Sequence, residues 1–273
     1  MTLQTALQQG QKLLEDATIP APRLTAEVLL AHSIGVPRSW LYAHSTDELK
    51  ELWWIHYGRY LHQRLSGMPT QYITGAQEFF GRDFKVTPAV LIPRPETEHL
   101  IEAALKYDAE TILDIGTGSG SIAVTLSLET EARVTATDIS SAALHVAQVN
   151  ARHLAALVDF LQCDLGSALR DRTFDLVVSN PPYVPESDRA ALQPEVRDHE
   201  PAQALFAGPE GLDIYRRLIP EAARLLKLKG RLFLELGYNS LDGVRQMLEG
   251  WENVEVIEDL SHIPRVIGAD KRT

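Results

Sequence analysis

The residues that most clearly could take part in a reaction are Asn180-Pro-Pro-Tyr183, which directly follow the apolar segment Phe174–Ser179. The Asn180 side chain offers a carbonyl acceptor, and prolines cannot donate backbone N–H groups, so the Pro181 carbonyl is left to face a ligand. Tyr183 adds a flat apolar face. Two acceptors beside a flat face suit a planar nitrogen that carries two N–H groups, such as an amide.

An amide nitrogen is a poor nucleophile because its lone pair is delocalised into the carbonyl. Acceptors that hold both N–H groups turn the lone pair toward an electrophile and disperse the charge that builds during reaction. Such orientation contributes about 7–11 kcal/mol in well-placed systems. Asn180, Pro181, Pro182 and Tyr183 are therefore predicted to bind substrate, with Asn180, Pro181 and Tyr183 catalytic. A rigid proline turn is the alternative, but it does not account for the asparagine and the tyrosine.

A second candidate site is the glycine-rich run Asp114-Ile-Gly-Thr-Gly-Ser-Gly120. Glycine permits positive φ and lets a ligand approach the backbone closely. The dinucleotide pattern fails because its third glycine comes one residue early, and a P-loop fails because no Gly-Lys-Ser/Thr follows. The spacing resembles the S-adenosylmethionine loop of class I methyltransferases; a turn without a ligand is the alternative. The predicted cofactor-binding residues here are Gly116, Thr117, Gly118, Ser119 and Gly120.

Two acids stand where later apolar runs end. Asp138 is placed to accept both ribose hydroxyls of a nucleoside, and its alternative role is to cap a helix that starts near Ser141. Asp164 is placed to accept from an adenine amino group, and its alternative is a solvated loop acid. A glycine loop and two acids at three successive strand ends together favour a nucleoside-bearing cofactor.

The elements that must position these residues alternate between short apolar runs and helical stretches. Continuous runs of this kind are typical of strands buried on both faces. Their alternation with helices predicts an α/β fold with a doubly wound, mostly parallel sheet, whose ligands bind at the carboxyl ends of the strands. The runs are Thr111–Ile115, Arg133–Thr137, Val158–Gln162, Phe174–Ser179 and Arg231–Leu236.

The chain before this pattern is predicted to hold two further parts. Residues 1–75 have apolar positions at helical spacing, broken by prolines, and indicate a small helical bundle. Ser45 and Glu48 have the spacing of a capping box for the helix that follows. Residues 76–92 read as a β-hairpin linker, and residues 93–273 as the domain that carries the motifs.

Bulk properties exclude several classes of protein. The net charge of −11 disfavours a broad nucleic-acid binder, so no direct nucleic-acid partner is expected. No run of about 20 apolar residues is present, and no secretory leader is expected. The one cysteine, Cys163, is expected to be buried. A cytoplasmic protein without a membrane partner is predicted. The nine histidines show no metal-ligand spacing, so no metal site is expected.

Several segments resemble the release factor glutamine methyltransferases (HemK/PrmC). They include Leu91–Glu98 (LIPRPETE), Pro69–Gly75 (PTQYITG), the Asn-Pro-Pro-Tyr motif, and Glu200-Pro201 with the following Gly208–Asp213 (GPEGLD). The resemblance implies methyl transfer from S-adenosyl-L-methionine, with S-adenosyl-L-homocysteine as product, to N5 of the glutamine in the Gly-Gly-Gln motif of peptide-chain release factors. Residues 1–75 would then recognise the substrate protein.

The resemblance carries the cofactor role to the glycine loop and Asp138, and it adds Asn180 to the cofactor contacts. Many relatives have tryptophan against the adenine at the position of Leu165, where weaker packing is expected. Two related activities remain open: methylation of a ribosomal-protein glutamine and methylation of a nucleic-acid amino group. The linker Pro93-Arg-Pro-Glu-Thr-Glu98 disfavours the first, because that subgroup commonly has Pro-Arg-Ser-Pro. A non-catalytic binding module is disfavoured by the intact Asn180–Tyr183 motif.

Overall fold

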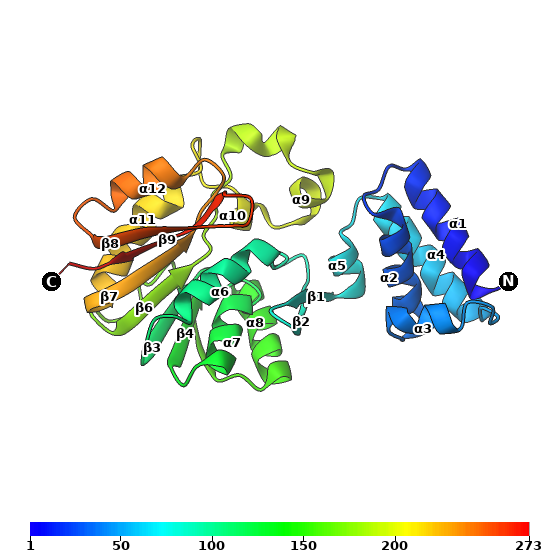
Figure 1. Cartoon of the computed structure of the whole chain (residues 1–273), viewed down its shortest axis with the longest axis horizontal. Helices are drawn as coiled ribbons and strands as arrows, with labels where there is room; N and C mark the ends of the chain where they lie inside the picture. Colours follow the sequence, from blue (N-terminus) through cyan, green and yellow to red (C-terminus); the bar gives the residue numbers. More distant parts are fainter. Residues whose placement is uncertain (273) are drawn as a thin grey trace. The chain divides into compact units, whose positions relative to one another are not determined.

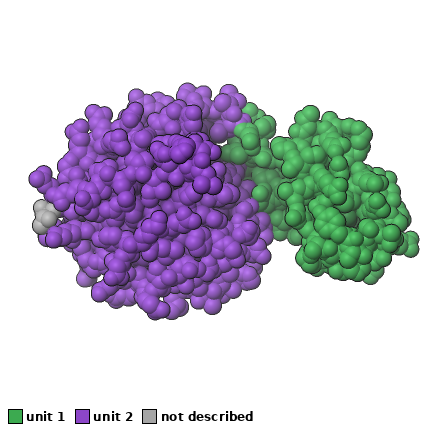
Figure 2. All heavy atoms as spheres, viewed as in Figure 1, with its two compact units in different colours: residues 1–75, 193–199 green, residues 76–192, 200–273 purple. Residues whose placement is uncertain are grey.

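The computed structural model describes residues 1–272 and forms two compact units (Figure 1). Figure 2 shows them as Met1–Gly75 with Gln193–His199, and Ala76–Leu192 with Glu200–Thr273. The short segment Gln193–His199 therefore belongs to the helical unit although it follows the Asn-Pro-Pro-Tyr motif in the chain. The sequence periodicity did not predict that this segment would pack with the helical unit.

The helical unit packs its helices around an apolar core that includes Leu29, Leu30 and Tyr57. Its helices are α1 (Leu3–Asp16), α2 (Pro22–Ile34), α3 (Arg38–Ala43), α4 (Glu51–Leu65), α5 (Thr70–Thr74) and α9 (Pro194–His199). The buried guanidinium of Arg64 pairs with Glu195 of α9, which ties the returning segment to α4. No helix within residues 1–272 has the length and apolar character needed to cross a bilayer.

The capping box predicted from Ser45 and Glu48 is wrong. Helix α4 begins only at Glu51, and its N-cap has no side-chain hydrogen bond. The carbonyls of Ser45 and Asp47 instead accept from the first backbone N–H groups of α1, at 2.9 and 3.0 Å. Those N–H groups have no partner inside their own helix, so this segment satisfies them.

The second unit, residues 76–192 and 200–272, holds the predicted catalytic residues and is termed the catalytic unit. It is built on a seven-stranded sheet of order β5-β4-β3-β6-β7-β9-β8. The first five strands in this order are parallel, whereas β9 runs antiparallel to both β7 and β8. Strand bounds are β3 Thr111–Ile115, β4 Arg133–Asp138, β5 Val158–Gln162, β6 Phe174–Ser179, β7 Leu226–Glu235, β8 Glu252–Glu258 and β9 Pro264–Asp270. The prediction of a doubly wound, mostly parallel α/β sheet is confirmed.

Helices cover both faces of this sheet because successive strand residues point to opposite sides. Ile112 of β3 packs into the core beneath α6 (Glu98–Ala104) and α7 (Ser121–Glu129), to which α8 (Ser141–Leu154) also contributes. Leu113 packs into the opposite core, beneath α11 (Asp213–Leu225) and α12 (Leu241–Met247). The remaining short helices are η1 (Pro95–Thr97), η2 (Glu186–Ala191) and α10 (Ala202–Leu205).

The predicted hairpin is present as β1 (Ala76–Phe79) and β2 (Arg82–Lys85), which pair antiparallel. Phe80 and Gly81 turn the chain with positive φ. Phe79 and Phe84 are buried in the core beneath α6 and α7, so the hairpin is anchored to the catalytic unit.

Candidate active site

The glycine loop joins β3 to α7 at the carboxyl edge of the sheet. Gly116, Gly118 and Gly120 all have positive φ, at +77°, +55° and +83°. A Cβ atom on Gly116 or Gly118 would meet nothing within 4 Å, whereas one on Gly120 would lie 3.0 Å from the Cβ of Ala147 on α8. The first two glycines therefore leave space for a ligand, and the third permits two helices to pack closely.

Asp138, at the end of β4, holds the glycine loop directly. One carboxylate oxygen accepts from the Gly118 N–H at 2.9 Å, and the other accepts from the Ser140 N–H at 2.8 Å. Burial raises the pKa of Asp138, against these backbone hydrogen bonds. Each oxygen keeps a second lone pair for a ligand hydroxyl. The helix-cap alternative for Asp138 is wrong, because the Ser140 side chain caps α8.

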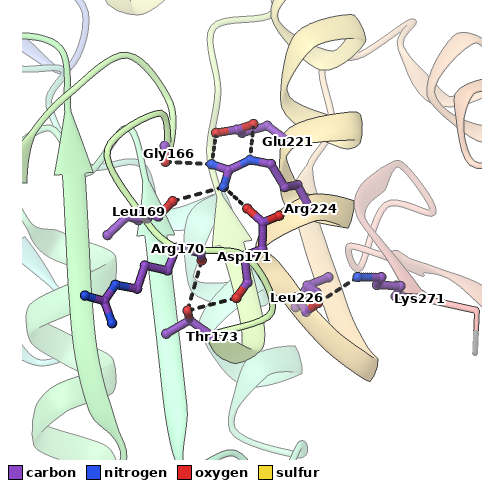
Figure 3. Close-up of polar contacts among 9 residues, drawn as sticks. All are labelled: Gly166, Leu169, Arg170, Asp171, Thr173, Glu221, Arg224, Leu226 and Lys271. Carbon is purple, nitrogen blue, oxygen red and sulfur yellow. Dashed lines mark hydrogen bonds and ion pairs between the residues drawn. The ribbon is translucent and has the colours of Figure 1, made fainter.

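The loop between β5 and β6 carries Asp164 and Leu165. Arg224 of α11 holds this loop through several polar contacts (Figure 3). The Arg224 guanidinium donates to the carbonyls of Gly166 and Leu169, both at 2.9 Å, and pairs with Asp171. Glu221, one helical turn before Arg224, holds the same guanidinium from the other side. This clamp gives the 11-residue irregular stretch between β5 and β6 a defined shape.

Asp164 itself pairs with Arg217, and both side chains are about half exposed. Leu165 has a left-handed backbone (φ +52°) and packs on the core beneath α11. Cys163 was expected to be buried, but it is only half-buried, and its thiol donates to the Leu165 carbonyl. The loop is thus shaped by contacts that neighbouring sequence does not reveal.

Asn180 stands where β6 ends, and its side-chain nitrogen donates to the Thr97 hydroxyl at 3.1 Å. Pro181 is buried. The Tyr183 hydroxyl donates to a carboxylate oxygen of Glu235 at 3.3 Å, and its ring lies against Gly237. Burial raises the pKa of Tyr183 well above its ordinary value, so the hydroxyl stays protonated and acts as a donor.

A single cavity of about 230 Å³ brings most of these predicted residues together. Its walls include Gly116, Thr117, Gly118, Ser119, Asp138, Asp164, Leu165, Asn180 and Pro182. Gly120, Pro181 and Tyr183 do not line it. The cavity thus extends from the glycine loop to Asn180 and Pro182 of the Asn-Pro-Pro-Tyr motif.

Other residues of the site could not be assigned from the sequence. Thr97 and Arg94 line the same cavity, and Glu235 lies behind Thr97. Arg94 pairs with the buried carboxylate of Glu200, which also accepts from the Ile92 N–H at 3.2 Å. Arg94, Thr97 and Glu200 fall within segments that resemble the methyltransferase family, whereas Glu235 belonged only to a predicted strand, Arg231–Leu236.

Comparison with known proteins places the chain in a family. Family models match the PrmC N-terminal domain over residues 5–75 and the methyltransferase small domain over residues 95–196. A release factor glutamine methyltransferase from Koribacter versatilis (strain Ellin345) is 47% identical, with 100% of both chains covered. One from Moorella thermoacetica is 43% identical, covering 100% of this chain and 99% of its own. The chain belongs to the release factor glutamine methyltransferase family.

Solved structures support the fold of this family member. A methyltransferase from Pyrococcus furiosus has a TM-score of 0.55 at 20% identity, covering 71% of this chain and 91% of its own. A T. thermophilus 16S rRNA N2 G1207 methyltransferase, solved with AdoMet and guanosine, has a TM-score of 0.55 at 19% identity. The match covers 72% of this chain and 50% of that one. At these identities the likeness shows the methyltransferase fold alone. The family relationship shows that the protein is a methyltransferase, and its fold agrees with this.

Proposed function

We propose that this enzyme methylates N5 of the glutamine in the Gly-Gly-Gln motif of peptide-chain release factors in the cytoplasm. The observation that carries the proposal is the Asn180 side chain, which lines the cavity with its amide nitrogen already bound to Thr97. Its oxygen is then the group that remains to accept a substrate N–H. Relatives that align with the whole length of the chain are named release factor glutamine methyltransferases, which supports the proposal.

S-adenosyl-L-methionine fits the cavity by the chemistry of its walls. Gly116 and Gly118 leave open space beside their backbone, as a bulky ligand requires. Asp138 offers carboxylate lone pairs for two ribose hydroxyls, and Asp164 with Leu165 would hold the adenine. This cofactor supplies an electrophilic methyl group on a sulfonium, and it leaves as S-adenosyl-L-homocysteine.

In the proposed mechanism, Asn180 and the Pro181 carbonyl each accept one N–H of the substrate amide. Both N–H groups are thereby held in place, and the nitrogen lone pair faces the methyl group. The nitrogen gains the methyl group and then loses one proton to solvent. Since an amide reacts poorly, fixed acceptors that disperse the developing charge supply most of the catalysis.

The helical unit is proposed to recognise the release factor, because none of the proposed site residues lies in it. Leu52 and Ile55 of α4 are its most exposed large apolar side chains, at 63% and 59%. Replacing both with serine should raise KM for the release factor and leave cofactor affinity unchanged. Deleting residues 1–75 is a poorer test, since it also removes Arg64, the partner of Glu195.

The test of the proposed function is methyl transfer to three purified acceptors: a release factor, a ribosomal protein and RNA. Transfer to the release factor, with the methyl group mapped to glutamine by mass spectrometry, supports the proposal. Transfer to RNA alone, or to the ribosomal protein alone, would contradict it in favour of one of the two related activities.

A further inference from the structure

A buried row of polar side chains runs from Asn180 into the interior of the catalytic unit. The Asn180 side-chain nitrogen donates to the Thr97 hydroxyl at 3.1 Å. The Thr97 hydroxyl faces the Glu235 carboxylate, whose buried Oε2 has no hydrogen-bond partner within residues 1–272. Tyr183 donates to the other oxygen of that carboxylate. Thr97 and Glu235 are only 3% and 2% exposed, so water does not compete for these bonds.

The number of protons that the Thr97 hydroxyl and the Glu235 carboxylate hold decides which way the Asn180 amide faces. An ionised carboxylate has no proton to donate, and a hydroxyl has one. The Thr97 proton therefore goes to Glu235, and the Thr97 oxygen is left as an acceptor only. If the Asn180 amide were turned by half a rotation, its oxygen would face the Thr97 oxygen without a proton between them.

We propose that Thr97 and Glu235 are positioning residues for methyl transfer, which keep the Asn180 carbonyl oxygen turned toward the substrate nitrogen. The reversed amide would present its own NH₂ group to the substrate NH₂ group, and two donors cannot bind each other. This inference rests on the proposed function, because it concerns the oxygen that would accept the N–H of the substrate.

The charge state of Glu235 gives the proposal a second readout. Burial raises the pKa of the Glu235 carboxyl to about 7. The Thr97 and Tyr183 hydroxyls oppose this shift. The Glu96 carboxylate raises the pKa further, and the Arg265 guanidinium lowers it. Once protonated, Glu235 can donate to Thr97, whose own proton is then free to turn toward Asn180. Turnover should therefore fall as the pH drops through about 7.

The experiment compares Thr97→Val, which keeps the side-chain shape but removes the hydroxyl, with Thr97→Ser, which restores it. Thr97→Val should lower kcat for release-factor methylation about 10- to 100-fold, the range of one or two hydrogen bonds to charged or oriented groups. Calorimetry should show unchanged S-adenosylmethionine affinity, and Thr97→Ser should recover most of kcat. Thr125→Val is the matched control, because Thr125 is buried and its hydroxyl has no partner among residues 1–272.

Three results would overturn the positioning role while leaving the proposed function intact. These are full kcat in Thr97→Val, equal losses in the valine and serine variants, or a pH inflection near 7 that persists in Glu235→Gln. Absence of methyl transfer by the unaltered enzyme to any glutamine would instead contradict the proposed function, and the positioning role with it.

Discussion

Gly118 and Gly120 differ by two positions in the same loop, yet the same substitution should harm them in different ways. Both have positive φ, so alanine at either position costs about 1–2 kcal/mol of folding free energy from the left-handed backbone. At Gly118 the added methyl group meets no protein atom within 4 Å and points into open space at the cavity. Gly118→Ala should therefore fold but obstruct the cofactor.

At Gly120 the added methyl group would lie 3.0 Å from the Cβ of Ala147 and 3.2 Å from its Cα. The backbone of α8 would have to move, which adds about 1–3 kcal/mol, the usual cost of overpacking a core. Gly120→Ala should therefore lose about 2–5 kcal/mol of unfolding free energy in total.

The assay is urea denaturation of both variants, together with calorimetric titration of S-adenosylmethionine. The expected result is a cofactor affinity lowered more than about tenfold in Gly118→Ala, a change of about 1.4 kcal/mol. Stability should be lowered mainly in Gly120→Ala. Equal stability losses, or unchanged affinity in Gly118→Ala, would refute the division of roles between these two glycines.

Three further changes test other parts of the site. Asn180→Ala should lower kcat about 100-fold or more while the enzyme still binds cofactor, as single-turnover kinetics would show; unchanged turnover would remove the orienting role. Asp138→Ala should weaken cofactor binding by about 1.5–3 kcal/mol for each hydroxyl bond lost, measured by calorimetry, and equal affinity would rule out the ribose contact. Arg224→Ala should cost about 1–3 kcal/mol of unfolding free energy and weaken cofactor binding, whereas Arg197→Ala, at an exposed ion pair, is the control.

The parallel half of the sheet was predictable because most of its strands are buried on both faces; the edge strand β5 is the exception. Runs such as Phe174–Ser179 are mostly apolar, and the five predicted runs all lie in strands. Strands β8 and β9 were missed because neither shows a long continuous apolar run. Glu252–Glu258 contains three glutamates and is largely exposed, and Pro264–Asp270 begins with proline and arginine.

The candidate site was predictable only where its residues follow one another in the chain. The glycine loop and the Asn-Pro-Pro-Tyr motif are contiguous, and their spacing alone pointed to chemistry. Thr97 and Glu235 meet across the fold, and the clamp of Arg224 on the loop after β5 joins residues more than 50 positions apart. Such contacts depend on strand order, which local patterns do not specify.

The measurement that tests the central claim most directly is transfer of labelled methyl from S-adenosylmethionine to a purified release factor. The matched control is the same factor with Gln→Ala in its Gly-Gly-Gln motif. Label on the intact factor and none on the altered factor is the predicted result. Equal labelling of both factors, or label on neither, would contradict the claim that this enzyme methylates that glutamine.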